Sequence, residues 1–134
     1  VAVSWYTEAN DSPTIYLVRS DDGGETFQEP LTIADAALNP AGRVDLLMTQ
    51  EGQVFVSWLQ ADAGNGYVIV TEIEADGTVG NQVHAGTTSS SRSSGFPRIV
   101  QYNDSILVAW TQTEPFLRVR TARVNLADFT PEES

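Results

Sequence analysis

The chain has 134 residues, of which 18 are acidic and 7 basic, so its formal net charge is -11 at pH 7. Hydrophobic residues make up 41% of it, which is enough for a buried core and excludes bulk disorder. This negative charge would repel a nucleic acid, and the absence of cysteine excludes disulfides and cysteine-bound zinc. Apolar runs reach about five residues, far short of the roughly twenty in a membrane-spanning helix. We therefore expect a globular chain with no nucleic-acid partner and no membrane span.

The predicted elements are short strands arranged in a repeat. In chain order they cover residues 1–5, 14–20, 31–34, 43–49, 54–58, 67–74, 82–85, 95–101, 106–110 and 117–124. Trp5, Trp58 and Trp110 each close a Val-Ser-Trp or Val-Ala-Trp triplet at the end of such a run. Their spacings are 53 and 52 residues, and segments 43–58 and 95–110 align without a gap. No stretch shows helical periodicity over ten or more residues.

Four short strands in a repeat of this length are typical of a blade of a β-propeller. The sequence therefore predicts an all-β fold with about two and a half four-stranded antiparallel blades. These are a partial blade over 1–41, a complete blade over 42–94 and a partial blade with three strands over 95–134. Since a propeller needs at least four blades to close, we expect the chain to be a piece of a larger ring. The alternative is a two-sheet sandwich of about ten strands.

A turn motif follows the second predicted strand. Residues 20–27 fit the pattern S-x-D-x-G-x-T-W/F, with Ser20, Asp22, Gly24, Thr26 and Phe27 at the fixed positions. We expect Asp22 to accept backbone N–H bonds across the turn and Gly24 to adopt a positive φ. Phe27 is expected to tuck its ring under the blade. We interpret the motif as structural. Segments 74–78 and 125–130 are weaker copies of the same turn.

With this motif and the blade repeat, the chain resembles the Asp-box (BNR-repeat) propellers of the sialidase superfamily. Segments 42–45, 54–58 and 92–98 look like the C-terminal part of exported, uncharacterised bacterial exo-sialidase-like proteins. The resemblance implies a six-bladed ring, an extracytoplasmic (periplasmic or secreted) location and a glycan ligand. It does not by itself imply an enzyme. No spacing typical of a metal, phosphate or dinucleotide site occurs, so we predict neither metal nor cofactor.

The candidate ligand residues lie where predicted loops leave the sheets opposite the 20–27 turn. Sialidases bind a substrate carboxylate with three arginines, because a guanidinium can bind a carboxylate through two hydrogen bonds. The resemblance makes Arg98 the first candidate for this role and Arg43 the second, with Arg92 and Asp45 beside them. The alternative for each arginine is a structural bond to a loop acid or carbonyl.

Two functions remain open from the sequence. The chain is either part of a glycan-binding or glycoside-hydrolase-related propeller, or part of a non-catalytic extracytoplasmic scaffold that binds proteins. The only histidine, His84, is expected on an outer strand, so no Ser/His/Asp set can be assembled. The expected partners are a glycan and either the remainder of the propeller or a second copy packed on the open blades.

Overall fold

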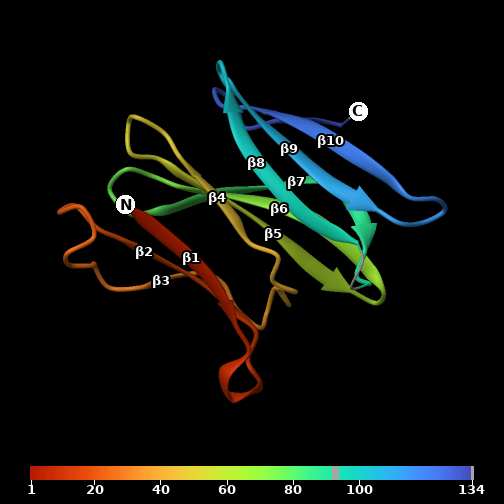
Figure 1. Cartoon of the computed structure of the whole chain (residues 1–134), viewed down its shortest axis with the longest axis horizontal. Helices are drawn as coiled ribbons and strands as arrows, with labels where there is room; N and C mark the ends of the chain where they lie inside the picture. Colours follow the sequence, from red (N-terminus) through yellow and green to blue (C-terminus); the bar gives the residue numbers. More distant parts are fainter. Residues whose placement is uncertain (92–93, 134) are drawn as a thin grey trace.

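The computed structural model of the protein describes residues 1–91 and 94–133 and shows three antiparallel sheets packed face to face (Figure 1). The first sheet contains β1 (Ala2–Thr7), β2 (Thr14–Arg19) and β3 (Leu31–Ala34). The middle sheet contains β4 (Asp45–Met48), β5 (Val54–Asp62), β6 (Asn65–Ile73) and β7 (Val79–Ser89). The last sheet contains β8 (Gly95–Tyr102), β9 (Ser105–Gln112), β10 (Arg118–Asn125) and β11 (Pro131–Glu133).

The prediction of an all-β chain built from consecutive antiparallel strands is confirmed. Apart from strands, the described residues form one short 3-10 turn, η1 (Ala9–Asp11). β5 pairs with both β4 and β6, as the repeat predicts. The alternative of two sheets is wrong, because the chain forms three. None of the helical segments among the described residues is long and apolar enough to cross a membrane.

The last sheet has one strand more than the sequence predicts. β11 pairs with the outer edge of β10, with Val124 opposite Pro131 and Ala122 opposite Glu133. Proline and glutamate are poor β-formers, so the sequence gives no strand signal here. Proline is nevertheless tolerated on an edge strand, where the missing N–H costs no ladder bond.

The middle sheet is covered on both faces, and its side chains alternate between two cores. On β5, Val56 and Trp58 pack against the first sheet, whereas Phe55 and Leu59 pack against the last sheet. All four are at most 1% exposed. This follows from the two-residue period of a strand, which sends successive side chains to opposite faces. A continuous apolar run on β5 is thus explained by burial on both faces.

The three tryptophans take equivalent directions, but only two of them are covered. Trp58 faces the preceding sheet and donates its Nε1–H to Thr71 Oγ1 at 3.0 Å. Trp110 also faces the preceding sheet and donates to the Thr87 carbonyl at 3.2 Å. Trp5 occupies the same position on β1, but none of the three sheets formed by the described residues packs on its face, and Trp5 is 37% exposed.

Because each sheet is an antiparallel meander, the connections fall alternately at two ends of the stack. We call one the loop end; it holds the connections 8–13, 35–44, 63–64 and 113–117 and the described residues 90, 91 and 94 between β7 and β8. We call the other the turn end; it holds the connections 20–30, 49–53, 74–78, 103–104 and 126–130. The expected separation of the 20–27 turn from the candidate arginines follows from this topology.

Candidate functional site

The 20–27 turn is held by the side chain of Asp22. Its Oδ1 accepts the backbone N–H of Thr26 at 2.8 Å and the hydroxyl of Ser20 at 2.7 Å, and its Oδ2 accepts the Thr26 hydroxyl. Gly24 has a φ of +94° and donates its N–H to Ser20 Oγ at 2.9 Å. The bonds from Thr26, followed by the one from Ser20, hold the pKa of Asp22 well below its usual range. The predicted roles of Asp22 and Gly24 are confirmed.

The predicted position of Phe27 is wrong. Its ring is 47% exposed instead of tucked under the sheet. The core between the first and middle sheets takes Ile33 and, partly buried, Leu31 of β3, and Phe27 is not part of it.

Weaker copies of this turn occur at the turn end of the other two sheets. In the middle sheet Asp76 accepts the N–H of Thr78 at 2.9 Å, and in the last sheet Asp128 accepts that of Thr130 at 3.2 Å. Hydrogen bonds from these threonines lower the pKa of both carboxyl groups. Both sequence segments were predicted as copies of the turn, and both form one.

Arg19 joins the first and middle sheets at the turn end, which the sequence did not reveal. Its guanidinium donates to the carbonyls of Gly52 at 2.8 Å, Glu74 at 3.1 Å and Ala75 at 3.2 Å. The acceptors are backbone groups on two separate turns. The sequence therefore carries no signal for this contact.

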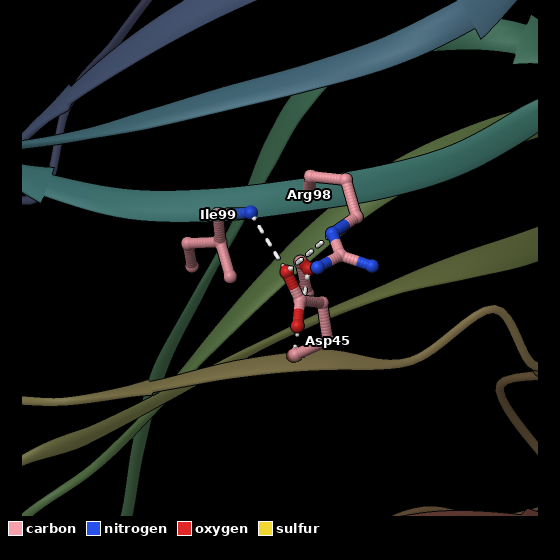
Figure 2. A network of polar contacts seen from close by, with 4 residues as sticks. Asp45, Arg98 and Ile99 are labelled. Carbon is pink, nitrogen blue, oxygen red and sulfur yellow. Dashed lines mark hydrogen bonds and ion pairs between the residues drawn. The ribbon is translucent and has the colours of Figure 1, made fainter.

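At the loop end, β4 of the middle sheet and β8 of the last sheet meet through Asp45 and Arg98. Figure 2 shows Asp45 reaching from β4 toward Arg98 and Ile99 of β8. Asp45 Oδ2 lies 3.3 Å from Arg98 Nε and accepts the Ile99 N–H at 3.0 Å. The Arg98 side chain is 83% exposed, so most of its guanidinium faces solvent. The pair ties two sheets together and leaves hydrogen-bond donors available to a ligand.

Arg43 lies next to the start of β8. Its guanidinium sits over the Phe96 ring at 4.9 Å from the centroid and donates to the Ser91 carbonyl at 3.1 Å. Burial lowers the pKa of Arg43, which at neutral pH remains charged. Gly95 has a φ of +85°, and an added Cβ there would lie 3.1 Å from Leu59 Cδ2, so the backbone conformation and the packing of Leu59 favour glycine at the start of β8.

The structure thus brings three of the four predicted ligand residues to one junction. Arg43 and Asp45 begin the middle sheet, and both contact the first residues of β8, where Arg98 lies. The fourth, Arg92, lies outside the described residues. The Arg98 guanidinium beside Asp45 can bind an anion, because a ligand carboxylate can compete for the donors of Arg98 that face solvent.

Tyr6 and Glu8 form a tyrosine–glutamate pair at the loop end of the first sheet. The Tyr6 hydroxyl donates to Glu8 Oε1 at 2.6 Å. Burial, then the bond to Glu8 and its charge, raise the pKa of Tyr6 to about 12. A phenol with this pKa stays protonated at neutral pH and donates its hydrogen to the Glu8 carboxylate. Tyr6 is also packed against the core between the first and middle sheets.

A hollow of about 550 Å³ at the loop end was missed by the sequence reasoning. It lies between the connection 35–44 and the middle sheet, and its polar lining includes Asn39, Asp62 and His84. His84 is exposed, as expected, and its ring lies 5.6 Å from that of Tyr67. These residues come from four separate segments, so only the fold brings them together. Over residues 1–91 and 94–133, no group of three or more histidines and acids is placed to hold a metal ion.

Comparison with known proteins gives no assignment: no protein-family model matches the chain, and no curated protein does. The function is therefore inferred from the geometry at the loop end.

Proposed function

We propose that this chain is a segment of a sialidase-like Asp-box propeller and that its loop end binds the carboxylate of an acidic glycan. The observation that carries the proposal is the Arg98–Asp45 pair at the β4–β8 junction, with Arg43 beside it and most of the Arg98 guanidinium in solvent. When one nitrogen of an arginine is bound to a protein carboxylate, the remaining N–H groups of the guanidinium point in a fixed direction. These groups can then bind a second carboxylate. The polar hollow along the connection 35–44 offers room for neighbouring sugar units.

We propose chiefly that the chain binds a glycan; hydrolysis of the glycan is the secondary proposal. Support for a binding role comes from Asp45, which already accepts bonds from Arg98 and Ile99. An exported location belongs to the same proposal, since sialylated glycans are found outside cells.

Titration calorimetry with sialyllactose and with lactose tests the proposal. We expect binding of sialyllactose alone, weakened about 10- to 100-fold in Arg98→Ala because a charge-assisted bond to the carboxylate is lost. Arg98→Lys keeps the charge without the planar fork and should recover only part of the affinity. Arg123→Ala is the matched control, because Arg123 is an exposed arginine near the turn end of β10. Equal affinity for both sugars would contradict the proposal. Release of free sialic acid would add catalysis to it.

The second candidate function is a non-catalytic scaffold that binds other proteins. It is favoured by the way the arginines already join strands: Arg43 bonds to the Ser91 carbonyl and Arg98 to Asp45. If neither sugar binds and Arg98→Ala lowers only the melting temperature, the scaffold is the better description.

A further inference from the structure

The hollow at the loop end has walls that backbone hydrogen bonds hold in place. One wall is the connection 35–44, which runs along the end of β5. The Ala61 N–H donates to the Asn39 carbonyl at 3.1 Å, and the Ala41 N–H donates to the Leu59 carbonyl at 2.7 Å. The other wall consists of β5, β6 and β7 of the middle sheet. The hollow is therefore shaped before any ligand arrives.

Two side-chain amides in the lining of the hollow have their nitrogens bound to the backbone. Asn39 Nδ2 donates to the Ala61 carbonyl at 2.9 Å, and Gln60 Nε2 donates to the Leu38 carbonyl at 2.8 Å. These bonds fix the orientation of both amides. Within the described part of the chain, neither side-chain oxygen accepts a hydrogen bond. The two amides therefore leave an acceptor each for a ligand that donates hydrogen bonds.

Asp62 and Tyr67 give the hollow a negative charge and an aromatic ring. Asp62 is exposed, and its carboxylate forms no hydrogen bond or ion pair with residues 1–91 or 94–133. Tyr67 is half-buried, and its ring lies 5.6 Å from that of His84. A cation is attracted both to a carboxylate and to the face of an aromatic ring. The hollow therefore suits a group that has a positive charge and N–H donors.

We propose that this hollow binds the ammonium group of an amino-sugar unit, with Asn39, Gln60 and Asp62 as the acceptors of its N–H bonds. An ammonium group has three N–H donors and no acceptor, which matches one carboxylate and two amide oxygens. A carboxylate-bearing unit is repelled by Asp62, so the acidic unit of the ligand belongs at Arg98 instead. The inference rests on the proposed function in one respect: the glycan ligand makes this ammonium group part of a sugar.

One short glycan can reach both the hollow and the junction between the middle and last sheets. Asn39 lines the hollow, and Arg43 lies at the junction. The two residues are four positions apart in the sequence, so their Cα atoms are at most about 14 Å apart. The ligand class is therefore a short oligosaccharide that has a carboxylate on one unit and a free amino group on another.

Titrations of the chain with glucosamine, N-acetylglucosamine and glucose, followed by the NMR signals of its backbone amides, test the inference. The three sugars share one ring, but only glucosamine has an ammonium group. We expect glucosamine alone to shift the signals of the lining residues. Asp62→Asn should weaken its binding about 5- to 10-fold, because a charge-assisted hydrogen bond is lost. Asp104→Asn is the matched control, since it removes the same charge from an exposed position at the turn end, and it should leave the affinity unchanged.

The outcomes separate this inference from the proposed function. The inference is wrong if none of the three sugars shifts the lining signals, if all three shift them equally, or if glucosamine binds Asp62→Asn as tightly as the wild type. Binding of sialyllactose without binding of glucosamine would overturn the inference and leave the proposed function intact. Binding of glucosamine without binding of sialyllactose would support the ammonium site and contradict the acidic unit at Arg98.

Discussion

The three sheets are antiparallel meanders, and the strand pairs next to their tryptophans have the same register, but the sheets differ in what covers them. Trp58 on the middle sheet is fully buried, while Trp5 at the equivalent place on the first sheet is 37% exposed. Val68 is fully buried, while its counterpart Val119 on the last sheet is 71% exposed. The comparison teaches that the sequence repeat sets the direction of a side chain, and that the neighbouring sheet sets its burial.

The largest contrast is expected between the tryptophans. Trp58→Ala should lower the free energy of unfolding by about 3–5 kcal/mol, because it removes a large buried side chain and leaves a cavity. Trp5→Ala should lower it by at most about 1 kcal/mol, since the ring is already partly in solvent. Urea denaturation at a chain concentration low enough to keep the protein monomeric measures both. Equal losses would show that the two rings are equally buried in solution.

A smaller contrast is expected between the two valines. Val68→Thr should destabilise the protein by about 1–3 kcal/mol, because the hydroxyl enters an apolar core without a partner. Val119→Thr should change the stability by no more than about 0.5 kcal/mol, as is usual at an exposed position. The same denaturation experiment tests this pair, and a costly Val119→Thr in the monomer would mean that the last sheet is covered by its own chain.

The junction between the middle and last sheets gives the next contrast. Asp45→Ala should cost about 1–2 kcal/mol, because the half-buried carboxylate accepts both the Ile99 N–H and the Arg98 bond. Arg98→Ala should cost at most about 1 kcal/mol, as is usual for an exposed ion pair. Thermal unfolding of the two single variants and of the double variant gives the coupling between them. A larger loss for Arg98→Ala than for Asp45→Ala would contradict this ranking.

The smallest expected effect concerns the turns of the three sheets and appears only in acid. Hydrogen bonds lower the pKa of Asp22 in the folded state, so its stabilising effect is present above the ordinary aspartate pKa of about 3.9 and is lost as the pH falls toward the folded value. In Asp22→Asn the part of the acid sensitivity due to this group disappears. Asp76→Asn in the middle sheet should reduce the acid sensitivity less than Asp22→Asn does, because Asp76 accepts fewer side-chain hydrogen bonds than Asp22.

Melting temperatures measured between pH 6 and pH 2 check this order. Both asparagine variants also remove one negative charge, so Asp21→Asn serves as the control for net charge. If Asp21→Asn and Asp22→Asn reduce the fall of the melting temperature in acid equally, the hydrogen bonds of the 20–27 turn make no specific contribution to the acid sensitivity.

The sequence predicted what depends on local pattern and failed where separate segments meet. The spacing of Trp5, Trp58 and Trp110 predicted the strand groups, and the motif around Asp22 predicted its turn, since both signals lie within one short segment. The position of the candidate ligand residues at the loop end was predicted in part, because the meander alone places Arg43 and Arg98 at the same end of the stack. The bond between Arg98 and Asp45 joins two sheets, and the hollow near Asn39 depends on four segments, so neither has a local signal.

The double coverage of the middle sheet also sets the order in which the molecule opens. Amides of β5 and β6 are bonded on both sides and lie between two cores, so they exchange their hydrogens only in the largest opening events. β1 and β11, at sheet edges, open in smaller and more frequent fluctuations. Asp45 sits on β4, which is bonded to β5. β4 is an edge strand of the middle sheet, so the carboxylate that holds Arg98 lies one strand away from the slowest-opening part of the chain.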